Sequence, residues 1–226
     1  KNISEIEITG LDGGGCVALT ALGAIREGFR VIMAQNAVAT AKFNIKRAQK
    51  LNKKFVTRNN LSLERLKQDN NVDNILIFTK DGLKAHTSQG DLFFHLNMAQ
   101  LRILNLNRNQ KDHMVEAMDL KPKMSVLDCT LGLGTDATVA SYIVGENGKV
   151  VGLESATLIY LITKYGLANF NHDNIAINHS LRRIESFNLH YLDYLKAQGD
   201  NSFDIVYFDP MFRCPLSASA AIAPLR

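Results

Sequence analysis

The chain has 226 residues, of which 46% are hydrophobic and 21% charged, a balance that suits one or two folded domains and excludes a disordered chain. Its three cysteines are odd in number and far apart, and its six histidines lack the spacing of ligand pairs, so we expect neither a disulfide framework nor a metal site. Because no apolar run approaches the roughly 20 residues of a membrane span, we expect a reduced, cytoplasmic protein without a membrane partner.

Residues 1–110 alternate short apolar strands with helices and contain no internal repeat. Ser62 is a candidate N-cap, and Asp81 and Gly82 are typical of a hairpin turn. In chain order we expect strands at 3–9, 29–34, 55–57, 75–79, 83–87 and 92–95, and helices at 16–27, 37–51, 63–67 and 98–106. The pattern predicts a small N-terminal α/β subdomain that ends in an antiparallel unit.

The basic residues concentrate in this first part of the chain. Residues 31–80 carry ten Lys or Arg against three Asp or Glu, a net charge of 10 − 3 = +7, whereas residues 81–226 carry thirteen against fifteen. A solvated helix face and an anionic partner explain such a run equally well. We hypothesise that residues 31–110 face RNA or another substrate. The closely spaced cations behind this hypothesis are Arg47, Lys50, Lys53, Lys54 and Arg58.

Residues 111–226 alternate helix and strand in a different order. The expected helices lie at 112–118, 136–144 and 158–167. The expected strands lie at 125–129, at 148–153, at 184–188 (as a strand or a helix end) and at 203–208, the last of a buried type. This order favours a parallel sheet with helices on both faces.

A glycine loop follows the first of these strands. Gly132 and Gly134 allow a tight turn and a close approach of the backbone to a ligand. Asp128 ends the strand at the carboxyl edge, where open α/β sheets bind their ligands, and the next strand ends at Glu154, which can bind ribose hydroxyls. Because Ala137 completes a G-x-G-x-x-A pattern, the loop suits a nicotinamide dinucleotide as well as S-adenosylmethionine.

The strand at 203–208 delivers an acid and a proline to the same edge. The run from Asp209 and Pro210 through Met211 to Phe212 resembles the [D/N/S]-P-P-[Y/F] signature of methyltransferases that act on exocyclic amines. The Asp209 carboxylate and the Pro210 carbonyl can accept the two N–H bonds of such an amine and turn its lone pair towards a methyl donor. Phe212 can stack on the base. These features favour S-adenosylmethionine as the cofactor.

Taken together, the runs at 127–137, 152–154, 166–167 and 207–212 resemble the ribosomal small subunit methyltransferase J family and its Gram-positive-type relatives. The resemblance spans about residues 31–226. It implies a Rossmann-like class I methyltransferase sheet, an S-adenosylmethionine-binding domain over residues 111–226, and methylation of guanosine N2 in small-subunit ribosomal RNA. Relative to that family, Thr135 replaces an Arg.

The resemblance also implies cofactor-binding positions. Asp193 lies where methyltransferases often keep an acid near the adenine amine, and a solvated Asp at a helix start is the alternative. With the loop residues, the candidate cofactor-binding set is Asp128, Gly132, Gly134, Thr135, Asp136, Glu154, Ser155, Asp193 and Asp209. The candidate catalytic residues are Asp209, Pro210 and Phe212.

Other functions and one question of completeness stay open. The alternatives are a nicotinamide-dependent oxidoreductase and a non-catalytic RNA-binding protein with a methyltransferase-like fold. The glycine run at 13–15 also satisfies G-x-G-x-x-A, but no acid follows about 20 positions later, so we interpret it as a structural turn. A complete sheet needs about three more strands after Asp209. Either they are missing from the C-terminus, which the resemblance favours, or N-terminal strands fill the sheet.

Overall fold

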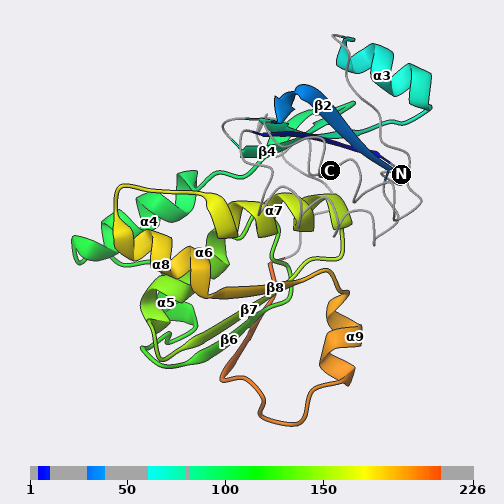
Figure 1. Cartoon of the computed structure of the whole chain (residues 1–226). Coiled ribbons are helices and arrows are strands. Elements are labelled where there is room, and N and C mark those ends of the chain that lie inside the picture. The colour runs from blue at the N-terminus through cyan, green and yellow to red at the C-terminus, as the bar shows by residue number, and fades with distance from the viewer. Residues whose placement is uncertain (1–4, 11–29, 39–60, 80–81, 210–226) are drawn as a thin grey trace. The chain divides into compact units, whose positions relative to one another are not determined.

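The computed structural model describes residues 5–10, 30–38, 61–79 and 82–209 (Figure 1). They form two compact units, the first ending at Phe94 and the second beginning at His95. Helix α4 (Asn97–Asn107) therefore belongs to the second unit, although we expected its residues on the N-terminal side of a boundary near residue 110. The division into a substrate-binding part and a cofactor-binding part stays a prediction.

The first unit contains a mixed five-stranded sheet in the order β2-β1-β3-β4-β5. Strand β1 is parallel to both β2 and β3, whereas β3, β4 and β5 form an antiparallel meander. This meander confirms the antiparallel unit predicted from the turn signals. The strands are β1 (Glu5–Gly10), β2 (Arg30–Val38), β3 (Ile75–Thr79), β4 (Gly82–Thr87) and β5 (Gly90–Phe93).

Several expectations for the N-terminal part lie outside the described residues. They include the helix at 16–27, the strand at 55–57, the glycine run at 13–15 and the basic cluster between residues 47 and 58. The helix expected at 37–51 conflicts with the structure at its start, because β2 continues to Val38. Val38 pairs with Gly10 of β1, so strand pairing overrides the local helical preference at these positions.

Helix α3 (Leu63–Asn70) begins where the sequence predicts. The Ser62 hydroxyl oxygen accepts a hydrogen bond from the Arg65 N–H at 3.2 Å, which satisfies one of the free amides of the first turn. Leu66 is fully buried against Ile75 and Ile77 of β3, so one apolar stripe of the helix packs on the sheet. The helix ends at Asn71, whose φ of 55° stops it in a left-handed turn.

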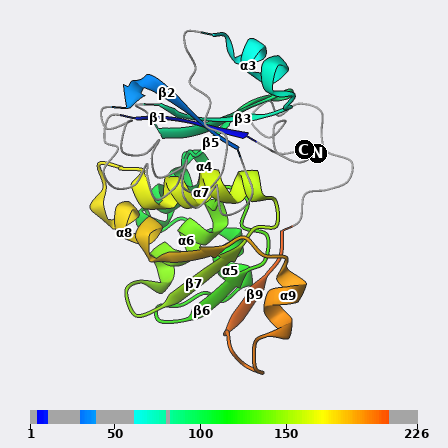
Figure 2. The ribbon, with the colours of Figure 1, turned by 45° about the vertical axis from the view of Figure 1, so that its right-hand side comes forward.

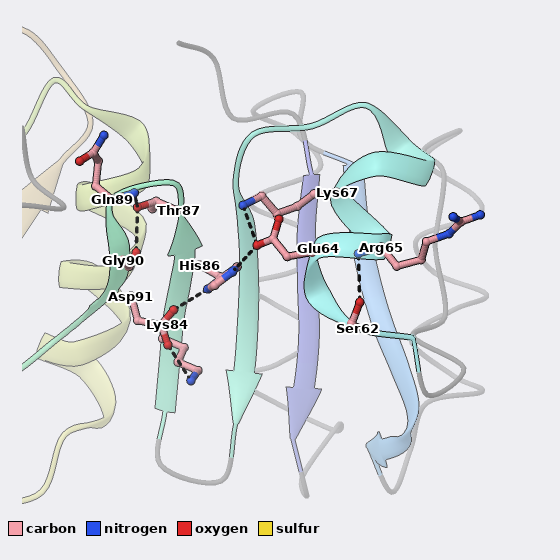
Figure 3. Close-up of polar contacts among 10 residues, drawn as sticks. All are labelled: Ser62, Glu64, Arg65, Lys67, Lys84, His86, Thr87, Gln89, Gly90 and Asp91. Atoms are coloured by element: carbon pink, nitrogen blue, oxygen red, sulfur yellow. Dashed lines mark hydrogen bonds and ion pairs between the residues drawn. The ribbon is translucent and has the colours of Figure 1, made fainter.

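A histidine bridge ties this helix to two strands (Figure 3). The His86 Nε2 atom on β4 lies 3.0 Å from a Glu64 carboxylate oxygen on α3, and its Nδ1 atom lies 2.6 Å from an Asp91 oxygen on β5. Lys67 and Lys84 pair with the same two carboxylates. The imidazole ring thus connects α3, β4 and β5 through its two nitrogens.

The second unit contains a four-stranded sheet in the order β8-β7-β6-β9, with every neighbouring pair parallel. The predicted parallel sheet is thus confirmed. The described strands of the N-terminal part form a separate sheet. The prediction that N-terminal strands complete the parallel sheet is therefore wrong for these strands. The strands are β6 (Ser125–Asp128), β7 (Lys149–Leu153), β8 (Ile184–Phe187) and β9 (Ile205–Tyr207).

Helices cover both faces of the parallel sheet (Figure 2). Tyr191, Tyr194 and Leu195 of α9 pack over the buried side chains of Leu127 and Val151. On the other face lie α6, α7 and α8. The bounds are α5 (His113–Ala117), α6 (Thr135–Val144), α7 (Thr157–Asn169), α8 (Ile175–Arg183) and α9 (Tyr191–Lys196). No helix in the described part of the chain has the length and hydropathy of a membrane span.

Two features of this unit differ from the sequence-based expectation. Helix α8 was not predicted, although its signals are present: Asn174 caps it by accepting the Ala176 N–H at 2.9 Å, and Ile177 and Leu181 bury one face. Strand β9 was expected to be buried, yet Val206 is 48% exposed. The reason is its place in the sheet, because among the described strands β9 pairs with β6 alone.

Candidate active site

The carboxyl ends of the four parallel strands meet at one edge. Asp128 lies in register with Gly152 of β7 and with Tyr207 of β9, and Leu153 lies in register with Phe187 of β8. The chain runs from β6 outward through β7 and β8, then crosses to β9 on the other side of β6. Open α/β sheets bind ligands at such a reversal of strand order. The candidate residues at 128, 154 and 209 therefore follow strands that share this edge.

Asp128 sits at the centre of this edge and is almost completely buried. Burial raises its pKa to about 7, although the Thr130 N–H lowers that pKa by donating to its carboxylate at 3.0 Å. The negative charges of Asp136, Glu154 and Asp209 add to the upward shift. Four carboxylates from different segments thus interact electrostatically, and the site favours a cationic ligand.

The glycine loop has the backbone conformation that its residues suggest. Gly132 has a φ of +52° and Gly134 a φ of +78°, in a region that side chains with a Cβ disfavour. Bonds to the neighbouring segments fasten the loop. Among them, the Leu131 N–H donates to the Leu153 carbonyl at 2.9 Å, and the Thr163 hydroxyl donates to the Gly132 carbonyl at 2.6 Å. Helix α6 then begins at Thr135.

The Glu154 carboxylate is oriented by backbone amides. One oxygen accepts the Gly132 N–H at 3.0 Å, and the other accepts the Ala156 N–H at 2.7 Å. Asn188, which the sequence does not single out, supports this turn by donating to the Glu154 carbonyl at 2.7 Å and to the Ser155 carbonyl at 3.3 Å. The Ser155 side chain is exposed beside it.

The acid corner after β9 is held against the glycine loop. The Asp209 N–H donates to the Thr130 hydroxyl oxygen at 2.8 Å, and the Cys129 N–H donates to the Tyr207 carbonyl at 2.9 Å. The exposed ring of Phe208 meets Tyr191 edge-on, with ring centroids 5.0 Å apart. Pro210, Met211 and Phe212 lie outside the described residues, so their roles stay predictions.

Asp136 takes part in a network that the sequence does not reveal. One carboxylate oxygen pairs with Arg102 Nη1 at 2.5 Å, and the other accepts the Tyr207 hydroxyl at 3.1 Å. Arg102 also donates two hydrogen bonds to the Asp112 carboxylate, from Nε at 2.7 Å and from Nη2 at 2.9 Å. Because Arg102 and Asp136 lie 34 positions apart, no local spacing pattern could have paired them.

Comparison with known proteins identifies the family. A family model described as "Putative SAM-dependent methyltransferase" matches residues 54–222, most of the chain. The chain belongs to this S-adenosylmethionine (SAM)-dependent methyltransferase family. Its cofactor is therefore SAM, and the choice that the G-x-G-x-x-A pattern left open is decided against a nicotinamide dinucleotide.

Two individual relatives are similar to this chain. The methyltransferase is 37% identical over 193 residues to "Uncharacterized protein YpiP" of Bacillus subtilis, which covers 85% of this chain and 74% of that protein. It is 30% identical over 142 residues to ribosomal RNA small subunit methyltransferase J of Francisella tularensis, covering 62% of this chain and 57% of the relative. The match thus spans less than two thirds of that relative's length.

A solved structure supports the fold. A SAM-dependent methyltransferase from Neisseria gonorrhoeae superposes with a TM-score of 0.56 at 16% identity, over 92% of this chain and 70% of that one. The predicted Rossmann-like α/β fold is confirmed. At this level of identity the likeness concerns the fold alone.

The residues of the methyltransferase edge suit the chemistry of SAM. Each carboxylate oxygen has two lone pairs, so Glu154 can accept ribose hydroxyls while keeping its two backbone bonds. Glycine at 132 and 134 allows the positive φ angles of this tight turn, which residues with a Cβ disfavour. The surplus of carboxylates around Asp128 suits a sulfonium cation.

Asp193 is the candidate that the geometry associates least with this edge. It lies in the first turn of α9, its side chain is 70% exposed, and it is 4.0 Å from Lys196. This arrangement agrees with the alternative of a solvated Asp at a helix start, and a role near adenine stays a prediction. Among the described residues no group of three or more His, Cys, Asp or Glu side chains is arranged to hold a metal ion.

Proposed function

We propose that this methyltransferase transfers the methyl group of SAM to an exocyclic amine of a base in RNA, specifically guanine N2 in small-subunit ribosomal RNA. The observation that carries the proposal is the 2.8 Å bond from the Asp209 N–H to the Thr130 hydroxyl. It holds an acid corner of the amine-methyltransferase type beside the cofactor loop. The name of the Francisella relative supports ribosomal RNA as the substrate class.

In this proposal the Asp209 carboxylate accepts one N–H of the amine and the Pro210 carbonyl accepts the other. An amine on a heteroaromatic ring is a poor nucleophile because its lone pair is delocalised, so holding the lone pair in line contributes most of the rate enhancement. Phe212 stacks on the base. Bound SAM supplies a methyl group that is already activated.

The proposed cofactor site uses the edge of the parallel sheet. Glu154 binds the ribose hydroxyls, and the loop at Gly132 and Gly134 lies along the amino-acid part of SAM. The remaining members of the proposed set are Asp128, Thr135, Asp136, Ser155, Asp193 and Asp209. The surplus of negative charge at Asp128 favours the cationic cofactor over its neutral product.

The proposal extends to the first part of the chain and to its location. We assign contact with the RNA backbone to residues 31–110, because residues 31–80 carry a net charge of 10 − 3 = +7. A cytoplasmic location follows from a ribosomal RNA substrate and from the absence of a disulfide pattern in the sequence.

The test combines a cellular and a biochemical measurement. Mass mapping of ribosomal RNA from cells with and without the gene should show one methylated guanosine that disappears with the gene. With purified protein, Asp209→Ala should abolish methyl transfer to that RNA while RNA binding persists, because the bond to Thr130 uses the backbone of residue 209 and survives. Asp200→Ala, in the exposed turn before β9, is the matched control. Full turnover by the Asp209 variant would refute the assigned role.

A further inference from the structure

The network around Asp136 joins four elements of the second unit. Asp112 caps α5 by accepting the Val115 N–H at 3.1 Å, and the same carboxylate receives two bonds from Arg102 of α4. Arg102 reaches Asp136 in the first turn of α6. Asp136 in turn accepts the hydroxyl of Tyr207, the last residue of β9.

The charged side chains of this network are largely buried, which strengthens the bonds between them. The side chains of Arg102, Asp112 and Asp136 are only 19%, 9% and 26% exposed, and charge-assisted bonds gain strength away from water. The hydrogen bonds to Asp112 and, to a smaller extent, to Asp136 raise the pKa of Arg102 above its ordinary value, although burial opposes this shift. In return, the bond from Arg102 lowers the pKa of Asp112. The planar fork of the guanidinium donates in three directions at once, which a lysine cannot reproduce.

Tyr207 connects the network to the candidate active site. It lies two residues before Asp209. Besides the backbone bond from Cys129 to the Tyr207 carbonyl, two bonds to side chains attach this strand end: Asp209 to Thr130, and Tyr207 to Asp136. The bond to Asp136 links the strand end to α6, whereas the other two link it to the segment that follows β6, so it restricts motion of the strand end relative to α6. Burial and the nearby Asp136 raise the pKa of Tyr207, so its hydroxyl stays a proton donor.

We infer that Arg102 is a positioning residue for methyl transfer. Arg102 orients the Asp136 carboxylate, which accepts the Tyr207 hydroxyl. This chain of bonds keeps the Asp209 corner at a set distance from the N-terminus of α6. Arg102 acts through Asp136 and Tyr207, not on the substrate. The inference rests on the proposed role of Asp209, but the geometry that it describes can be measured without any substrate.

The first experiment measures hydrogen exchange of the Asp209 amide in the whole chain. Tyr207→Phe removes one hydroxyl and should make this amide exchange about tenfold faster, because the attachment of the strand end to α6 is lost. Tyr142→Phe is the matched control: it also removes a hydroxyl that links α6 to α4, through Asn107 at 2.9 Å, yet it touches neither Asp136 nor β9. Unchanged exchange at Asp209 in Tyr207→Phe would overturn the inference.

The second experiment separates catalysis from cofactor binding. With ribosomal RNA as substrate, Tyr207→Phe and Arg102→Lys should each lower kcat by about ten- to hundredfold. Tyr207→Phe should change the Kd for SAM by less than about threefold, because the Arg102 bond that orients Asp136 remains. Tyr207→Phe should add little in the Arg102→Lys background, since both act through Asp136. Additive losses, or a loss in SAM affinity alone, would contradict a positioning role. If Asp209→Ala retains activity while exchange responds as expected, the proposed function fails and the positioning network stands.

Discussion

The Glu154 carboxylate at the end of β7 accepts the N–H of Gly132 in the loop after β6, at 3.0 Å. This bond fixes the direction of the carboxylate before any cofactor arrives, and it leaves lone pairs for two hydroxyls. Because the same side chain also accepts the Ala156 N–H at 2.7 Å, Glu154 is pre-organised for the role that we propose for it.

Replacing Glu154 by Gln should weaken SAM binding. The amide keeps the size of the side chain but loses the charge that strengthens hydrogen bonds to ribose, so we expect Kd to rise by about ten- to hundredfold. Isothermal titration with SAM measures this directly. Glu185→Gln, on an exposed position of β8, should leave Kd unchanged. Equal affinities of wild type and the Glu154 variant would exclude ribose binding by this residue.

Asp128 should make stability depend on pH. Its pKa is about 7 in the folded protein and 3.8 as a free side chain. Between these values the folded state binds more protons than the unfolded state, so this residue makes the free energy of unfolding fall as pH rises. Asp128→Asn removes that contribution. The advantage of the variant should grow from about pH 4 to pH 7, by at most about 1.4 kcal/mol per pH unit.

Denaturant unfolding of both proteins across that range tests the prediction for Asp128. The asparagine keeps an oxygen that can accept the Thr130 N–H, so the loop bond itself is preserved. A stability difference that stays constant with pH would show that the carboxyl is not titrating in this window.

Gly152 of β7 should not tolerate a side chain. A Cβ at this position would lie 2.4 Å from one methyl carbon of Leu131 and 2.9 Å from the other, and Leu131 is itself buried in the cofactor loop. Gly152→Ala should therefore lower the free energy of unfolding by about 1–3 kcal/mol through overpacking, and should also weaken SAM binding as the loop shifts. Gly199→Ala, whose Cβ would have its nearest neighbour at 3.9 Å, should have little effect in either measurement.

The histidine bridge of the first unit should add stability near neutral pH that is lost in acid. Bonds from His86 and Lys67 lower the pKa of Glu64. Partial burial raises the pKa of Asp91, but bonds from His86 and Lys84 outweigh it and lower that pKa overall. Carboxylates with lowered pKa values add stability above their unfolded pKa, which is lost as pH falls through the folded value. His86→Ala should thus lower Tm near neutral pH and lessen the further fall of Tm below about pH 4. A parallel fall in both proteins would contradict this assignment.

Many local elements could be predicted from their own residues. The strand at β3, the Ser62 cap and the start of α6 follow from short patterns of apolar residues, capping hydroxyls and glycines. Helix α8 shows the limit of such reading, because it mixes polar Asn and His with three buried residues, one of which is the polar Ser180. Its stability comes from packing, which a propensity pattern understates.

The sequence by itself determined the parallel sheet, the glycine turn after Asp128 and the family, because these depend on short patterns within segments and on the order of those segments along the chain. Only the tertiary structure decided which charges meet. Arg102 meets Asp136 because α4 packs against α6, and Asp128 loses its contact with water on a strand that lies between β7 and β9. Pairing and burial of this kind depend on three-dimensional packing, and no periodicity in the chain encodes them.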